Sequence, residues 1–235
     1  MYRNFFKRFL DIVLSFLALL ILFPILLVLI VIGWIAMKGN PFFVQPRPGK
    51  INPKTGKEKI FNLVKFRTMT CEKDKDGNLL PDDKRLTKYG KMLRSTSLDE
   101  LPELWNILKG DMSIVGPRPQ LVRDMVFMTE LERKRHIATP GLTGLAQVSG
   151  RNNITWEKKL SIDLEYIEDI TFFGDLKIIF LTIFKVFKRE DIQEEGFETA
   201  EDLGDYLLRK DVIDSVYHKE KLLEADKLLA INTKQ

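Results

Sequence analysis

The most pronounced hydrophobic pattern along the chain is an unbroken apolar run near its start. Residues 12–37 carry no formal charge and are aliphatic or aromatic apart from Ser15, Pro24 and Gly33. The run exceeds the about 18 apolar residues that mark a membrane helix and the about 7–15 residues of a signal-peptide core. No small-residue cleavage site follows it. The pattern therefore predicts a membrane-embedded helix.

Basic side chains flank this helix on both sides, with Arg3, Lys7 and Arg8 before it and five Lys or Arg residues at positions 38–57 after it. Lys and Arg favour the cytoplasmic side, so both ends favour the same side of the bilayer. Pro24 lies near the middle and favours a kink. Each half would be about 18–20 Å long, enough to enter and leave a bilayer core about 30 Å thick. A re-entrant hairpin and a simple kinked span both remain open at this point.

After residue 38 the pattern changes to short extended and helical segments. Residues 39–70 contain turn residues, and the alternation over 59–66 is typical of a small β-hairpin. Residues 71–87 are charged and predict an exposed loop. Apolar spacings of three and four predict helices over 98–109, 121–136, 156–167 and 176–189. The predicted fold class is α+β, mainly α.

The helix predicted over 176–189 is amphipathic, with basic side chains on one side and Leu, Ile, Phe and Val on the other. A basic amphipathic helix rich in aromatic residues is typical of one that lies in the headgroup plane. A helix that turns its apolar side to the protein core has the same pattern. The membrane helix near the N-terminus favours the first interpretation.

Charge is distributed unevenly along the chain. Residues 191–235 contain twice as many acidic as basic side chains, although the whole chain carries a net charge of +4. The basic remainder suits an anionic partner such as lipid headgroups, a nucleotide or a phosphorylated substrate. Three regions are therefore expected: a membrane helix (1–38), a body (39–190) and an acidic helical extension (191–235).

Cysteine and histidine content narrows the chemistry further. The chain has a single cysteine, Cys71, so no intramolecular disulfide can form, and cytoplasmic exposure is the simpler inference. The two histidines, His136 and His218, lie far apart in sequence and lack cysteine neighbours, so the sequence offers no zinc ligand set.

Two adjacent carboxylates, Asp99 and Glu100, open the helix predicted over 98–109. Ser97 and Glu100 have the spacing of a capping box, and acidic residues are favoured in a first helical turn, so a structural role is one interpretation. Pro102 fits a helix that starts near Asp99 better than one that starts at Ser97. In either case the carboxylate is expected to stay ionised, as a nucleophile or a metal ligand.

Two further segments have the composition of anion-binding loops. Arg118 stands between Pro117 and Pro119, which fix the backbone and would hold the guanidinium for a bidentate grip on phosphate. The segment 140–152 contains three glycines and ends near Arg151. Glycines allow backbone amides to approach an anion, but neither segment is diagnostic alone.

The conjunction of these motifs is specific. Six runs occur in order between about residues 3 and 190: Phe6 to Asp11, Lys65 to Met69, Ser97 to Pro102, Lys109 to Ser113, Val115 to Pro119, and Pro140 to Asn152. Together they resemble the bacterial sugar transferase family, and in particular its small monotopic polyprenyl-phosphate phosphoglycosyltransferases.

The resemblance implies a re-entrant membrane helix, interfacial amphipathic helices and a Mg²⁺-dependent reaction in two steps. Asp99 would attack the β-phosphate of a UDP-sugar, release UMP and hold the phosphosugar until polyprenyl (undecaprenyl) phosphate attacks it. Glu100 would assist as a metal ligand or general-base partner, and Asp99 would also contact the metal. The resemblance assigns the phosphates to four basic residues, and the nucleotide or sugar to Asp163. These basic residues are Lys65, Arg94, Arg118 and Arg151.

The expected partners are a UDP-sugar, polyprenyl phosphate and membrane lipids, without nucleic acid; candidate protein partners are a second copy of the chain or downstream glycosyltransferases. The expected location is the bacterial inner membrane with the body on its cytoplasmic face. Relatives suggest an N-acetylated amino sugar as the donor. Two other functions stay open: a non-catalytic membrane scaffold, and a glycosyltransferase that releases UDP.

The sequence departs from the family pattern in three places. Phe23 precedes Pro24 where the best-known relatives have serine, and Leu145 stands where an aromatic residue is common. The acidic extension after residue 190 lies beyond the family core, and the sequence assigns it no role.

Overall fold

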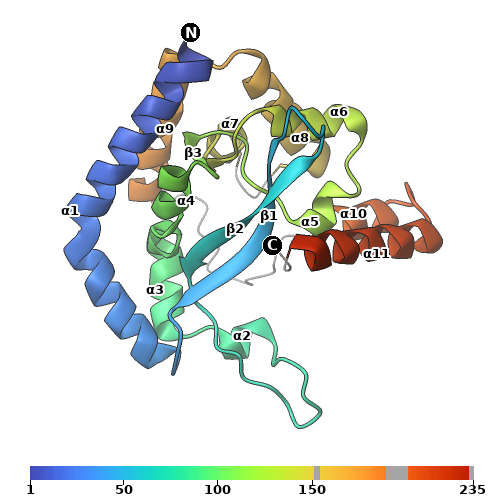
Figure 1. The fold of residues 1–235 in the computed structure, drawn as a ribbon. Helices are drawn as coiled ribbons and strands as arrows, with labels where there is room; N and C mark the ends of the chain where they lie inside the picture. Colours follow the sequence, from blue (N-terminus) through green and yellow to red (C-terminus); the bar gives the residue numbers. More distant parts are fainter. Residues whose placement is uncertain (151–153, 189–200, 233–235) are drawn as a thin grey trace.

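Helix α1 (Lys7–Ala36) forms one edge of the molecule in the computed structural model, which describes residues 1–150, 154–188 and 201–232. A short π-helical turn (Tyr2–Phe6) precedes it. Within these residues α1 is the one helix long and apolar enough to cross a membrane. It contains Pro24, and Figure 1 shows it bending around one side of the molecule. The long apolar helix predicted for this region is therefore present, and it begins earlier than its charge-free stretch.

One face of α1 packs against the body along most of its length. Leu29 belongs to a buried cluster with α3 (Lys88–Thr96), while Leu19 and Leu22 pack on the cluster that contains α4 (Glu103–Lys109). Large apolar side chains on α1 that remain exposed include Phe16, Leu20, Ile21, Phe23, Val28, Val31, Trp34 and Ile35. Contiguous apolar surface of this kind marks a membrane or protein contact, so it supports membrane association.

The predicted hairpin is confirmed: β1 (Phe42–Ile51) pairs antiparallel with β2 (Glu58–Phe66). Pro46 and Pro48 lie within β1 and cannot donate hydrogen bonds, but a two-stranded sheet leaves each strand one open edge, where proline is tolerated. Gly56 takes a φ of +66° in the connecting turn. The hairpin crosses the middle of the molecule in Figure 1, beside α3 and α4.

A second, parallel pair of strands was not predicted. It joins β3 (Ser113–Val115) to β4 (Gly141–Thr143), and α7 (Leu145–Ser149) follows directly. The interpretation of 140–152 as a loop is therefore wrong for its first part. A Cβ on Gly116 would lie 2.3 Å from the Thr139 carbonyl oxygen, so glycine permits the two segments to approach each other.

The single helix predicted over 121–136 is also wrong. The segment forms α5 (Val122–Met125), α6 (Glu130–Arg133) and a 3₁₀ helix (Lys134–Ile137). Thr129 starts α6 through a capping box: its hydroxyl accepts a hydrogen bond from the backbone N–H of Glu132, whose carboxylate accepts one from the Thr129 N–H. The apolar spacing that predicted one helix continues across Thr129, but this cap starts a new helix there.

The remaining predicted helices are confirmed, and the charged segment 71–87 is mostly exposed loop around the short α2 (Asp82–Arg85). α8 spans Trp156–Glu168 and α9 spans Phe172–Lys188. Towards the C-terminus lie α10 (Leu203–Arg209) and α11 (Ser215–Asn232).

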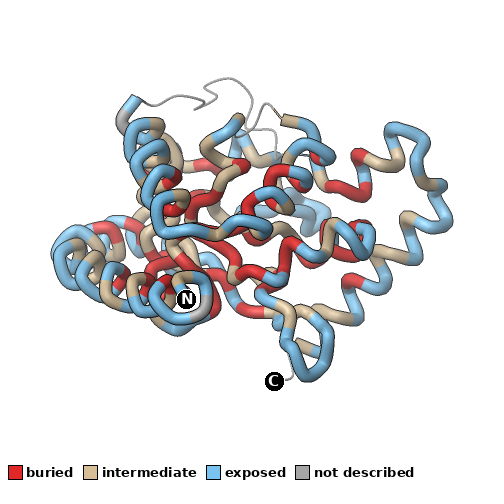
Figure 2. Tube along the Cα trace, turned by 90° about the horizontal axis from the view of Figure 1, so that it is seen from above, coloured by how far each residue is buried: buried red, intermediate tan, exposed pale blue. Residues whose placement is uncertain are grey.

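The C-terminal helices share a buried core with the body. Leu203, Tyr206 and Ala225 belong to one cluster with Val122 and Trp156. Figure 2 shows the buried positions gathered towards the middle of the molecule and the exposed ones around its outside. The acidic extension is thus part of the packed structure.

The charged residues at the start of α1 connect three elements. Lys7 forms a buried ion pair with Asp175 of α9 at 2.5 Å. Arg8 donates hydrogen bonds to the Ile107 and Leu108 carbonyl oxygens in the last turn of α4. Asp11 accepts a hydrogen bond from the Ile114 N–H of β3. Cations near a helix C-terminus are favourable. These contacts fix α1 to the elements that carry the candidate site.

Helix α9 keeps much of its apolar surface exposed. Ile178 and Asp175 are buried, but Phe173, Phe180 and Phe184 are 79%, 65% and 55% exposed. A helix that turned its apolar side only to the core would not leave these rings uncovered. The exposure favours the membrane-surface interpretation over the core-facing one.

Candidate active site

Asp99 and Glu100 lie in a 3₁₀ turn (Leu98–Glu100) between α3 and α4. Ser97 ends α3 in the left-handed conformation, with a φ of +55°, and its side chain forms no cap hydrogen bond. The capping-box interpretation of Ser97 and Glu100 is therefore wrong. Because the backbone reverses at Ser97, the Glu100 side chain is available for contacts outside its own helix.

Glu100 is held by two cations from distant parts of the chain. The Lys65 Nζ of β2 donates to Glu100 Oε1 at 2.8 Å, and Arg118 Nη2 donates to the same oxygen at 2.6 Å. Lys65 Nζ also lies 3.0 Å from Oε1 of Glu103, which is 1% exposed. Two carboxylates therefore share one ammonium group next to Asp99.

The three carboxyl groups have different proton affinities. Burial, and then the charge of Glu100, raises the pKa of Asp99, against the opposing effect of nearby cations. Burial would also raise the pKa of Glu100, but Arg118 and Lys65 outweigh it and hold that pKa well below its usual range. Burial and Glu100 raise the pKa of Glu103 to about 7. The sequence predicted an ionised carboxylate at this position, and the lowered pKa of Glu100 agrees with that prediction. The charge of Glu100 opposes ionisation of Asp99.

Asp99 and Glu100, but not Glu103, line a cavity of about 910 Å³, referred to below as the basic cavity. Its acidic lining consists of Asp99, Glu100, Asp124 and Asp202. Its basic lining consists of Arg47, Lys65, Arg67, Arg85, Arg94, Arg118 and Lys159. The volume is typical of small-molecule sites, and the excess of cations suits an anion.

Four predicted site residues, Lys65, Arg94, Asp99 and Arg118, meet in this cavity with Glu100. Arg94 also donates from Nε to the Thr68 hydroxyl at 3.1 Å, which orients its guanidinium. Arg151 lies outside the described residues.

Asp163 lies outside the basic cavity, unlike the other predicted site residues that the structure describes. It is 2% exposed and does not line the basic cavity. Its carboxylate accepts hydrogen bonds from Arg135, which in turn donates to the backbone carbonyl of Arg118 at 2.7 Å. Asp163 therefore supports the segment that carries Arg118.

The sequence analysis did not predict Arg47 as a site residue, although Arg47 lines the basic cavity. Arg47 donates to Gln45 Oε1 at 2.6 Å and to the Pro119 carbonyl at 3.2 Å, and burial followed by the Arg118 charge lowers its pKa to about 10. A signal was present, because Arg47 stands between Pro46 and Pro48 just as Arg118 stands between two prolines. Lys159 and Asp202 had no such signal, since only packing of α8 and the C-terminal extension brings them here.

A magnesium ion fits this donor set. Among the described residues no group of three or more His, Cys, Asp or Glu side chains could hold a metal by itself. Mg²⁺, however, typically uses one or two carboxylates together with substrate phosphates. Asp99 and Glu100 provide that pair in a cavity whose charged lining is mostly basic. Burial, followed by the charge of Glu100, raises the pKa of Asp99, and a bound cation would offset the second of these effects.

Fold and site together suggest a membrane-associated protein whose paired carboxylates line a cavity with mostly basic charged side chains. The sequence places it more narrowly: the chain belongs to the bacterial sugar transferase family, whose sequence model matches residues 2–189.

The chain is also similar in sequence to individual sugar transferases and exopolysaccharide proteins. The uncharacterized sugar transferase EpsL of Bacillus subtilis is 50% identical over 177 residues, which cover 74% of this chain and 85% of EpsL. The exopolysaccharide production protein ExoY of Sinorhizobium fredii is 35% identical over 195 residues, covering 75% of this chain and 83% of ExoY. The UDP-glucose:undecaprenyl-phosphate glucose-1-phosphate transferase of Escherichia coli is 40% identical over 191 residues, covering 77% of this chain but only 40% of that protein.

Proposed function

We propose that this protein transfers a phosphosugar from a UDP-sugar to polyprenyl phosphate through a covalent intermediate on Asp99. The observation that carries the proposal is the placement of Asp99 and Glu100 at the edge of a cavity lined by seven Lys and Arg side chains. The activity for which the Escherichia coli relative is named, transfer of glucose 1-phosphate to undecaprenyl phosphate, supports the same class of reaction.

In the first step an Asp99 oxygen attacks the β-phosphorus of the UDP-sugar. A bond forms between this oxygen and phosphorus, and the bond between the β-phosphorus and the bridging oxygen breaks, so that UMP leaves. In the second step an oxygen of polyprenyl phosphate attacks the same phosphorus and Asp99 leaves as a carboxylate. The product is a polyprenyl diphosphate sugar, and covalent storage lets two substrates react in turn.

The residues around Asp99 suit this chemistry. A carboxylate that approaches a diphosphate meets like charge, so fixed cations must neutralise the phosphates before attack. Arg94 and Arg118 line the cavity beside Asp99 and would bind phosphate oxygens. Lys65 and Arg118 hold Glu100 ionised beside the proposed nucleophile. Bound Mg²⁺, with Asp99 and Glu100 as candidate ligands, would supply further charge neutralisation.

A re-entrant arrangement of α1 is part of the proposal. The body contacts α1 near its start through Lys7 and Asp11, and near its end through Leu29 and Met37. A straight span would place these two ends on opposite sides of the bilayer, whereas one water-exposed body contacts both. Pro24 supplies the bend. Both ends of α1 and the active site would then lie at the cytoplasmic face.

This topology can be tested with the exposed Cys71, the single cysteine of the chain. A membrane-impermeant maleimide should label Cys71 in inverted vesicles but not in intact spheroplasts. The variant Arg3→Cys with Cys71→Ser should behave in the same way. Labelling of the position 3 variant in spheroplasts would instead support the simple span.

The reaction is tested by nucleotide release. Purified protein with Mg²⁺ and a panel of UDP-sugars, including UDP-glucose and N-acetylated donors, should release UMP. Asp99→Asn should abolish this release, whereas Asp76→Asn in the exposed loop 71–87 should not affect it. Without acceptor, the wild-type chain should gain the mass of one phosphosugar. Release of UDP would support a glycosyltransferase that leaves the phosphate behind, and no turnover with any donor would support a scaffold.

A further inference from the structure

A second cavity adjoins the basic cavity at Ser97 and Glu100, which line both. It has a volume of about 260 Å³ and is mostly apolar; it is called the apolar pocket below. Its apolar walls include Leu101 and Leu104 on one side, Leu142 and Val148 on another, and Ile179 and Ile183 of α9. Nothing in the phosphosugar chemistry of the basic cavity requires this pocket.

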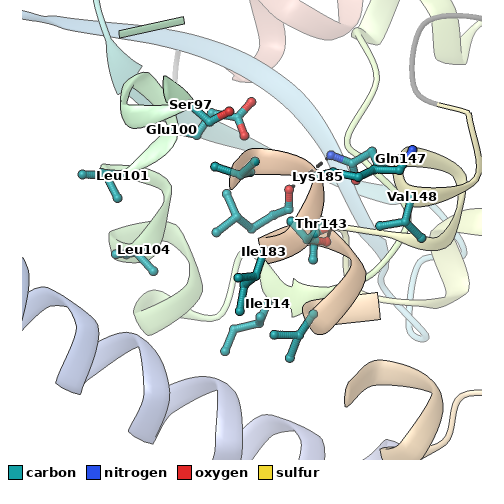
Figure 3. Close-up of a pocket in the computed structure, with 14 residues that line it drawn as sticks. Ser97, Glu100, Leu101, Leu104, Ile114, Thr143, Gln147, Val148, Ile183 and Lys185 are labelled. Carbon is teal, nitrogen blue, oxygen red and sulfur yellow. Dashed lines mark hydrogen bonds between the residues drawn. The ribbon is translucent and has the colours of Figure 1, made fainter. Parts of the chain in front are cut away.

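The charged side chains of the apolar pocket lie towards one end, and the Thr143 and Thr182 hydroxyls in its wall hydrogen-bond to each other at 2.6 Å. Figure 3 shows Ser97, Glu100, Gln147 and Lys185 towards one end, with Leu104, Ile114 and Ile183 towards the other. The polar end contains a catalytic-site carboxylate and the cation of Lys185. The distribution matches a ligand with a small charged head and an apolar body.

The pocket also lies beside the surfaces that suit a bilayer. Helix α9 forms one wall, and the rings of Phe180 and Phe184 on the same helix are exposed. At the apolar end, Leu104, Ile114 and Leu142 belong to, or pack on, the buried cluster that also meets Leu19 and Leu22 of α1. The apolar pocket is therefore bordered by exposed apolar surface of α9 and by packed apolar side chains that continue to α1.

From this arrangement we infer that the apolar pocket binds the acceptor lipid, with its phosphate at the end near Glu100 and Lys185 and the first isoprene units along Ile183 and Leu104. The inference rests on the proposed function, to which it adds the acceptor site. Pockets that enclose whole drug-sized ligands measure about 300–1,000 Å³, so this smaller pocket holds only the start of a polyprenyl chain. The rest of the chain stays in the bilayer.

The two substrates then approach one pair of carboxylates by separate routes. The nucleotide sugar enters the basic cavity, and the lipid phosphate enters the apolar pocket. Release of UMP in the first step needs only the basic cavity. A change that fills the apolar pocket should therefore impair the second step while it spares the first.

The test separates these steps. Ile183→Trp fills the pocket, and Phe180→Trp places the same side chain on the exposed face of α9 as the matched control. With undecaprenyl phosphate in mixed micelles, Ile183→Trp should raise the acceptor KM by about tenfold, the expected effect of losing the burial of about two methylene groups. Its UMP burst without acceptor should equal that of the wild-type protein, and Phe180→Trp should leave both quantities unchanged.

Val148→Trp, on the opposite wall, repeats the test if Ile183→Trp does not fold. Equal acceptor KM values in the pocket variants and in Phe180→Trp would overturn the acceptor site. Loss of the UMP burst from both pocket variants, with the control active, would also overturn it, because the pocket would then serve the donor. Failure of the proposed function is distinct, since the wild-type protein would then release no UMP from any UDP-sugar.

Discussion

The adjacent carboxyl groups of Asp99 and Glu100 have pKa values shifted in opposite directions by their surroundings. Glu100 accepts hydrogen bonds from Lys65 and Arg118 and stays ionised, whereas the pKa of its neighbour Asp99 is raised by burial and by the Glu100 charge. A carboxylate of higher basicity is a stronger nucleophile once it has lost its proton. Cations that enter with the substrate would lower this pKa and so generate the nucleophile when the substrate is bound.

The raised pKa of Glu103 predicts how the stability of the protein changes with pH. Its pKa is about 7 in the folded protein, against 4.5 for the ordinary group, so between these values the native state holds a proton that the unfolded state has released. The free energy of unfolding contributed by this group therefore falls as the pH rises through that window. Glu103→Gln removes the effect. The Tm of Glu103→Gln minus the Tm of the wild-type protein, both measured in detergent, should increase from pH 4.5 to 7. Above pH 7 this difference should stay constant.

The exposed Glu72→Gln serves as the control for this series, and its Tm difference from wild type should not vary over the same window. A difference between Glu103→Gln and wild type that stays flat from pH 4.5 to 7 would contradict the raised pKa.

Asp163 provides a second prediction at the same scale. Asp163 and Arg135 are 2% and 1% exposed, so Asp163→Asn leaves a buried guanidinium without its charge partner. Removal of one partner from a buried pair costs roughly 3–5 kcal/mol. We expect a large fall in Tm, measured by thermal unfolding in detergent, while Glu201→Gln, which breaks the exposed pair with Arg209, should have little effect. An unchanged Tm with a raised KM for the UDP-sugar would instead support direct substrate binding by Asp163.

Among the elements, α1 and α9 act as a pair. Asp175 at the start of α9 accepts hydrogen bonds from Tyr2, Lys7 and Tyr166, which ties α9 to the start of α1. The rings of Tyr2 and Phe172 also meet edge to face. Both helices leave apolar side chains exposed. The contacts therefore hold the exposed apolar surfaces of α1 and α9 in one fixed relation.

The depth of α9 can be measured directly. Phe180→Trp places an indole on its exposed face, where insertion into the acyl boundary of a bilayer is expected. In proteoliposomes, lipids brominated on their chains should quench the added fluorescence relative to wild type. Val212→Trp, at an exposed site beside α10, should show no quenching beyond background. Equal quenching of the two variants would argue against membrane contact by α9.

For the molecule as a whole, the acidic extension completes both the core and the site. The Leu203 N–H donates to Asp124, the Trp156 indole donates to the Glu201 carbonyl, and Asp202 lines the basic cavity. The extension lies beyond the part of the chain that matches the family.

Leucines on the extension allow a matched test. Leu203 is 3% exposed and Leu223 is 59% exposed. Leu203→Ala should destabilise the protein by about 2–5 kcal/mol, because a buried leucine is replaced by a cavity. Leu223→Ala should change stability by less than about 0.5 kcal/mol. Denaturant unfolding in detergent measures both, and similar small effects would show that the extension does not stabilise the body.

Local patterns were sufficient where one segment carries the whole signal. The apolar run predicted α1, the alternation over 59–66 predicted the hairpin, and the periodicity of 156–167 predicted α8. Periodicity failed over 121–136, because it does not register the Thr129 cap that divides the segment. It also missed the parallel pairing of β3 with β4, since each strand has only three residues and its partner lies far along the chain.

For the site, the sequence by itself determined the candidates: the motifs around Lys65, Asp99 and Arg118 are recognisable along the chain, and these three residues line one cavity. Tertiary structure alone decided how they act. It turned Glu100 towards two cations, placed Asp163 behind Arg118, and brought Asp202 to the cavity. The physical reason is that proton affinity and electrostatic attraction depend on burial and on distances of a few ångströms, which residues far apart in sequence acquire only on folding.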